Sequence, residues 1–152
     1  MLWLWPTRAS GVWSSTSTGS GAFRPCGASS ADVDVLGYAA TDAFKTLDGS
    51  QIREWAGRVS LPAQNQSLAE ATVPVGGATT EHYHRTTEEL YLVSAGSGRL
   101  VVDGEERAIG EGDCALIAPG ARHKLLNVGD VPLRVICACA PAYSDEDTCL
   151  TE

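Results

Sequence analysis

Short apolar runs alternate with turn residues along most of the chain, and this pattern predicts β-strands rather than helices. Clusters of Gly, Pro, Asn and Asp separate the runs, and no long amphipathic helical pattern is present; residues 41–46 could at most form one helical turn. Strands at this spacing are typical of a sandwich or barrel, so the expected fold class is all-β. The runs lie at residues 67–75, 89–95, 99–102, 113–117 and 133–140.

Two short segments carry the clearest turn signals. Asp103-Gly104 lies between two apolar runs and is the strongest hairpin signature in the chain. Gly96-Ser97-Gly98 predicts another turn, between the runs at 89–95 and 99–102. Sixteen Gly and seven Pro residues fit a fold with many turns.

The composition divides the chain into a body and two flanking segments. Residues 1–40 are rich in Ser, Thr, Gly and Ala, and we expect them to be a disordered low-complexity segment. Trp3, Trp5 and Trp13 are unusual there, so this segment either docks on the body or precedes the true start of the protein. Residues 48–143 form the predicted barrel, and residues 144–152 are expected to be an exposed acidic tail.

The charge of the chain excludes some partners. With 19 acidic and 11 basic residues, the formal net charge is −8, whereas nucleic acids and anionic membranes attract clustered Lys and Arg. No apolar run approaches the roughly 18 residues that cross a bilayer. Five cysteines form no regular disulfide framework and no signal peptide is evident, so we expect reduced thiols in a cytoplasmic protein.

The three histidines of the chain lie close together in the sequence and point to a metal site. His82 and His84 are two residues apart, so in a strand they share a face. Glu89 opens the next apolar run, and His123 follows the turn at Pro119-Gly120. Three imidazoles and one carboxylate form a mixed nitrogen and oxygen set that suits one divalent transition metal: Fe, Mn, Ni, Zn or Cu.

With these residues in place, the sequence resembles the cupin superfamily, in particular its small single-domain bacterial members of the cupin-2 or mannose-6-phosphate-isomerase-like type. The first cupin motif is a glycine, five residues, H-x-H, three or four residues, Glu, six residues and a glycine. It fits Gly76, His82, His84, Glu89 and Gly96.

The second cupin motif also fits, 15 residues after the first. Gly112, Gly120, His123 and Asn127 are in register, whereas Ala118 replaces the motif's proline, which concerns turn stiffness rather than metal binding. The resemblance implies a double-stranded β-helix, a jelly-roll barrel with the ion in one mouth. It also implies that the metal ligands are His82, His84, Glu89 and His123.

Several residues near these ligands have alternative roles. Glu88 is a second candidate for the carboxylate ligand, but only Glu89 keeps the six-residue spacing to Gly96. Tyr91 shares the inward face of Glu89 and is the candidate catalytic base, as in cupin lyases with a similar tyrosine, or else it lines the barrel. Cys137 and Cys139 alternate in the last run and are expected to line the pocket, and Cys114 is expected in the core.

The resemblance leaves two classes of function open. The first is a metal-dependent enzyme, of the dioxygenase, lyase or isomerase type, acting on a small oxygen-rich metabolite. The second is a binding or sensor module whose metal anchors a small molecule without turnover. Family members usually pair their barrels, so a homodimer is expected.

Overall fold

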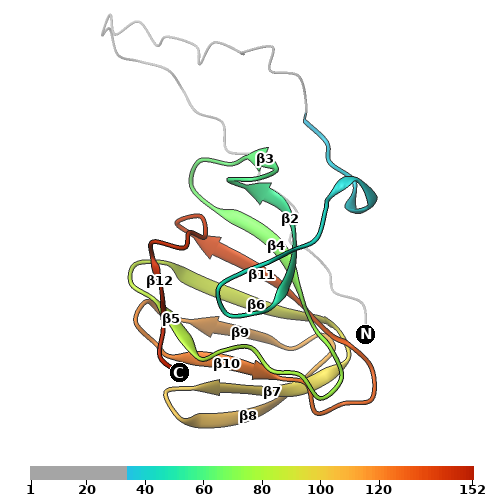
Figure 1. Cartoon of the computed structure of the whole chain (residues 1–152), viewed down its shortest axis with the longest axis vertical. Helices are drawn as coiled ribbons and strands as arrows, with labels where there is room; N and C mark the ends of the chain where they lie inside the picture. Colours follow the sequence, from blue (N-terminus) through green and yellow to red (C-terminus); the bar gives the residue numbers. More distant parts are fainter. Residues whose placement is uncertain (1–33) are drawn as a thin grey trace, which may run out of the picture. The chain divides into compact units, whose positions relative to one another are not determined.

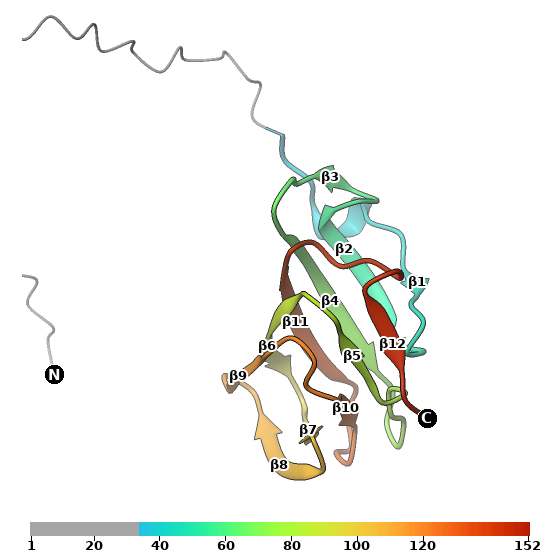
Figure 2. The same cartoon turned by 90° about the vertical axis from the view of Figure 1, so that its left-hand side faces the viewer.

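The computed structural model describes residues 34–152, which fold into two β-sheets that face each other (Figures 1 and 2); all strand pairs are antiparallel except β2 with β3. The first sheet has seven strands in the order β1-β2-β4-β11-β6-β9, with β3 paired to β2. The second has five strands in the order β12-β5-β10-β7-β8. The all-β prediction is therefore confirmed.

In the first sheet the strands are β1 (Phe44–Lys45), β2 (Gln51–Gly57), β3 (Leu61–Pro62), β4 (Ser67–Val73), β6 (Glu88–Ala95), β9 (Cys114–Ile117) and β11 (Leu133–Ala140). In the second they are β5 (His82–His84), β7 (Ser97–Val102), β8 (Glu105–Gly110), β10 (His123–Leu126) and β12 (Thr148–Leu150).

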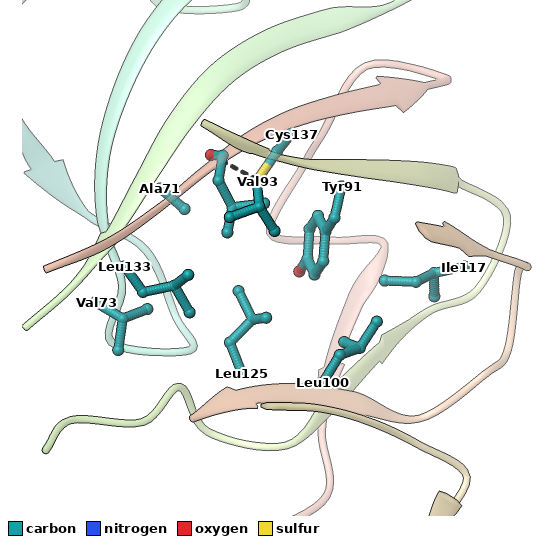
Figure 3. Packing of buried hydrophobic residues seen from close by; sticks show 10 residues of the cluster. Ala71, Val73, Tyr91, Val93, Leu100, Ile117, Leu125, Leu133 and Cys137 are labelled. Atoms are coloured by element: carbon teal, nitrogen blue, oxygen red, sulfur yellow. Dashed lines mark hydrogen bonds between the residues drawn. The ribbon is translucent and has the colours of Figure 1, made fainter. Parts of the chain in front are cut away.

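Alternating side chains create the core between the two sheets. Every second residue of β6 and of β11 is buried, as the period of a strand requires. Figure 3 shows these side chains packing together, with the Tyr91 ring among them. The core comprises Ala71, Val73, Tyr91, Val93, Leu100, Ile117, Leu125, Leu133, Val135 and Cys137. Cys114, expected in this core, is exposed because its position in β9 alternates with the inward Ala115 and Ile117.

The predicted hairpin is confirmed, whereas the other turn has a different role. Asp103 and Gly104 both have positive φ, +47° and +83°, as a tight turn between β7 and β8 requires. At Gly96 the chain instead passes from the first sheet to the second, because β6 and β7 belong to different sheets. Gly96 has φ +80°, and a Cβ atom there would lie 2.7 Å from the carbonyl oxygen of Pro132. This corner therefore requires glycine.

Both ends of the described part of the chain differ from the prediction. The expected exposed tail at 144–152 is wrong: β12 pairs with β5, and Ser144 and Thr148 are buried. Residues 34–40, assigned to the low-complexity segment, contain the 3-10 helix η1 (Tyr38–Ala40). They are held because the Tyr38 hydroxyl donates to Glu70 and its ring lies 5.7 Å from Trp55. The rest of the low-complexity segment, with its tryptophans, lies outside the described residues.

Helical structure is scarce in the described part of the chain. The sequence allowed one helical turn at residues 41–46, but this segment contains β1 instead. Within residues 34–152, no helix is long and apolar enough to cross a membrane.

Candidate metal centre

Four side chains from both sheets converge between them. His82 and His84 project from one face of β5, and His123 of β10 lies opposite His82 in the strand pairing. Glu89 reaches the same place from β6 of the facing sheet. One potential ligand atom from each residue lies within 4.8 Å of the other three, and all four residues are buried. The structure thus brings together the four residues that the sequence singled out. Glu88 points away from them, on the exposed side of β6.

The second nitrogen of each imidazole is fixed by a hydrogen bond. His82 Nδ1 lies 2.9 Å from the carbonyl oxygen of Thr80, and His123 Nδ1 lies 2.9 Å from that of Ala121. Carbonyl oxygens only accept, so both Nδ1 atoms must donate. The Thr148 hydroxyl donates to Ser144, so it accepts from His84 Nδ1 at 3.1 Å. In its neutral form, each ring therefore turns an unprotonated Nε2 toward the centre.

These acceptor atoms face one another in a way that requires a positive charge between them. His84 Nε2 is 3.1 Å and His123 Nε2 is 3.3 Å from the same carboxylate oxygen, Glu89 Oε2. His123 is completely buried, and its Nε2 makes no hydrogen bond with residues 34–152. A buried acceptor without a donor is costly, and protons or one cation would satisfy this group. The donor set fits a divalent transition metal.

The electrostatics favour cation binding. Burial raises the pKa of Glu89, but contacts with His123 and His84 outweigh it and lower that pKa to about 2. Glu89 is therefore a carboxylate at neutral pH. Burial, together with the neighbouring His123, lowers the pKa of His82, which favours the neutral imidazole. Burial also acts to lower the pKa of His123, but the contact with Glu89 raises it overall, so a proton competes with a metal for Nε2.

A small cavity opens beside the four residues and contains about 50 Å³ of water-accessible volume. That volume holds a few waters or part of a small ligand, not a polymer. His82, His84 and Glu89 form one side of it. The remaining lining residues are Phe44, Thr46, Asp48, Ser50, Ile52, Glu54, Ser67, Ala69, Ala71, Thr79, Tyr91, Leu125, Cys137, Cys139 and Tyr143.

Tyr91 belongs to the apolar core, where Figure 3 shows its ring, and it also lines the cavity beside the four residues. Its ring centre is 5.9 Å from that of His123, and the residue is 5% exposed. No hydrogen bond joins its hydroxyl to another residue of 34–152, and the residue lines the cavity. Burial and the charge of Glu89 raise the pKa of Tyr91, so it is a neutral phenol in the protein without an ion.

The two cysteines of β11 line the cavity, as their alternation predicted. Cys139 Sγ donates to Glu89 Oε1 at 3.4 Å, so the thiol supports the carboxylate. Burial raises the pKa of both thiols, Cys137 and Cys139, which keeps them protonated. They therefore act as small, uncharged lining groups.

Two contributors to the site were missed because they lie in segments with weak sequence patterns. Thr148 supports His84 from the segment expected to be a tail. Tyr143 lines the cavity, with its ring 5.8 Å from that of His84, and its backbone N–H donates to Ser67. The segment after β11 therefore covers the cavity rather than leaving into solvent.

Together, the fold and the cluster define a small two-sheet β-barrel protein with a buried histidine–carboxylate site. The family model for the cupin domain matches residues 69–139. An uncharacterized protein of Methanocaldococcus jannaschii is 43% identical over 109 residues, which cover 72% of this chain and 87% of that protein. The chain belongs to the cupin family.

Solved structures agree on the fold. A Klebsiella pneumoniae protein with a double-stranded β-helix domain superposes with a TM-score of 0.63 at 16% identity, covering 80% of this chain and 99% of that one. The Streptomyces nucleoside dehydratase Pac13 superposes with a TM-score of 0.66 at 17% identity, covering 80% of this chain and 92% of Pac13. The predicted double-stranded β-helix is confirmed.

Proposed function

We propose that this protein is a metal-dependent cupin enzyme that acts on a small oxygen-rich metabolite. The observation that carries the proposal is the set of acceptor atoms of His82, His84, Glu89 and His123, which face one another without a donor between them. These four residues would hold one divalent ion, Fe, Mn, Ni, Zn or Cu. A bound ion would polarise an oxygen of the ligand or activate a bound water.

The residues around the cavity favour catalysis over ligand binding without turnover. The free hydroxyl of Tyr91 lies on the same wall as Glu89, where it could exchange a proton with a ligand. Tyr143 lines the same cavity, with its ring centre 5.8 Å from that of His84. The fold neighbours include an enzyme, the nucleoside dehydratase Pac13. We place the reaction among dioxygenase, lyase and isomerase types.

The test of this proposal is turnover. Protein purified without chelator should contain one metal per chain, and its Fe(II) or Mn(II) form should consume oxygen or convert a compound from a metabolite panel. Tight ligand binding without conversion under any metal would favour the alternative, a binding or sensor module. Iron or manganese in the purified protein would point to an oxygenase, and zinc to an isomerase.

Tyr91→Phe should lower turnover by about 100-fold or more while metal content stays unchanged, because general acid–base groups contribute roughly that factor. The phenyl ring keeps the packing against the core. Tyr83→Phe is the matched control, since Tyr83 lies between the two histidines of β5 but is absent from the cavity lining. Equal rates for wild type and Tyr91→Phe would leave Tyr91 as a lining residue.

We also propose a homodimer formed by the outer face of the first sheet. Leu68, Leu90, Leu92 and Leu116 are exposed on it, and strand pairing places them around Ala138 and Ile136 of β11. The exposed Glu88 and Arg134 lie at opposite ends of this apolar strip. A two-fold axis across the strands would bring Arg134 of one copy over Glu88 of the other, so the strip is self-complementary.

Light scattering should therefore give twice the 16.0 kDa of one chain. Leu90→Asp combined with Leu92→Asp should reduce the mass to that of one chain, because two carboxylates would be buried in the interface. Val131→Asp, an exposed apolar site on a loop, is the control that should leave the dimer intact. A monomeric wild type would refute the proposal.

We further propose a cytoplasmic location. It is supported by the four cysteines within residues 34–152, none of which forms a disulfide with another described residue. Two of these thiols, Cys137 and Cys139, line the cavity, and Cys139 can donate to Glu89 only as a protonated thiol.

A further inference from the structure

The wall of the cavity formed by residues 44–54 is acidic. Asp48 and Glu54 both line the cavity, and they are only 9% and 7% exposed. Buried carboxylates need donors, and an incompletely paired carboxylate oxygen beside a cavity is available to a ligand. The family motifs do not include either residue.

Asp48 is held through one of its two oxygens. Oδ1 accepts hydrogen bonds from Thr46 Oγ1 at 2.6 Å, Ser50 Oγ at 2.8 Å and Ser50 N at 3.2 Å. None of the hydrogen bonds within the part of the chain that the structure describes involves Oδ2, and Asp48 lines the cavity. The carboxylate is therefore fixed in position while one oxygen remains free.

Two hydrogen bonds connect Asp48 to the candidate metal centre. Its carbonyl oxygen accepts from the N–H of Thr80 at 2.8 Å, and the carbonyl oxygen of Thr80 accepts from His82 Nδ1. The position of this wall relative to His82 is thus set by the backbone. A ligand anchored at the four-residue site would extend toward Asp48.

Glu54 adds a second negative charge to this wall. Its Oε1 accepts from the N–H groups of Val59 and Ser60 at 2.8 and 2.9 Å. Among the described residues, no Lys or Arg lines the cavity. A second groove, here called the outer groove, is lined by Lys45 and Arg58 and also by Glu54 and Asp145; there Arg58 pairs with Glu146 at 3.3 Å. A negative group at this end of a ligand would meet two carboxylates and no cation.

We propose that Asp48 is a specificity-determining residue: its free oxygen accepts a hydrogen bond from a hydroxyl or ammonium group of the bound ligand, and Asp48 and Glu54 together reject phosphate or carboxylate groups at that end. The substrate class is therefore a neutral or cationic hydroxylated small molecule. The inference rests on the proposed metal-dependent function, because the metal supplies the other anchor.

Hydroxamates that share one metal-binding end and differ in the tail test this inference. Acetohydroxamate reports on the metal centre alone, and chains of equal length ending in a hydroxyl, an ammonium, a methyl or a carboxylate group report on the wall. With metal-loaded protein, calorimetry should show the hydroxyl and ammonium tails binding at least about tenfold more tightly than the carboxylate tail, because hydrogen bonds to charged groups are the strong ones.

Asp48→Asn should remove most of the preference for ammonium over carboxylate while the affinity for acetohydroxamate stays the same. Asn keeps the oxygen that accepts from Thr46 and Ser50, so the loop stays paired. Glu54→Gln is a second variant with a smaller effect in the same direction. Asp145→Asn, in the outer groove, is the control that should leave the order of tails unchanged.

The outcomes separate the two proposals. Equal affinities of all tails for the wild type, or tighter binding of the carboxylate tail, would overturn the role of Asp48 and leave the metal centre standing. An unchanged order of tails in Asp48→Asn would do the same. If acetohydroxamate does not bind, the proposed metal centre is contradicted, and the proposed role of Asp48, which depends on it, is contradicted as well.

Discussion

His123→Ala is expected to abolish metal binding, so protein purified without chelator should fall from one metal per chain to almost none. His123 lies opposite His82 in the strand pairing and is fully buried, and its Nε2 has no donor among residues 34–152. Removing it deletes one of four donors. We expect a loss of affinity greater than the roughly 10- to 100-fold that supporting residues around a metal contribute. Elemental analysis and titration with Mn(II) or Zn(II) measure it.

A matched control separates metal loss from unfolding. Leu125 lies on the same strand as His123 and faces the same core. Leu125→Ala should therefore lower the free energy of unfolding by about 2–5 kcal/mol without changing the metal content. A chelator should lower the melting temperature of the wild type and of Leu125→Ala, but not that of His123→Ala, because a ligand that binds the native state stabilises it. Stoichiometric metal in His123→Ala would refute the ligand assignment.

The centre of the site could be predicted because its residues obey local rules. His82 and His84 share a face through the two-residue period of a strand, and the same period separates Glu89 from Glu88. The sequence predicts a turn at Gly96, but it does not distinguish a hairpin from a corner between two sheets. That distinction depends on which strands pair, and β6 pairs with β9 and β11 rather than with β7.

The surroundings of the site could not be predicted because they depend on long-range pairing. Asp48 and Glu54 are charged, and charged residues are usually exposed. Glu54 is buried because β2 pairs with β4, and Asp48 is buried in the turn between β1 and β2, where its carbonyl oxygen accepts from the N–H of Thr80. Thr148 lies in an acidic segment with no strand alternation. Its segment becomes a strand because the edge of β5 is open to pairing.

Thr148→Val is expected to weaken metal binding by about 10- to 100-fold, the usual effect of removing a group that orients a metal-binding histidine. Thr148 accepts the hydrogen bond of His84 Nδ1 from 64 residues away in the chain. Without that acceptor, the imidazole can rotate or carry its proton on Nε2, the nitrogen that faces Glu89. Valine keeps the size and the β-branch, so packing in β12 is preserved.

Two further variants distinguish orientation of His84 from loose docking of the C-terminal strand. Thr148→Ser retains the hydroxyl and should restore most of the metal affinity. Thr151→Val removes the side-chain hydrogen bonds to Glu81 that tie down the residue after β12. The Thr151 hydroxyl makes no hydrogen bond to the four candidate ligands, so this variant should bind metal as the wild type does. If Thr151→Val weakens metal binding as much as Thr148→Val, β12 supports the site only through its docking against β5. If only Thr148→Val does, the threonine hydroxyl sets the tautomer of His84, and the C-terminal strand is a structural part of the metal centre.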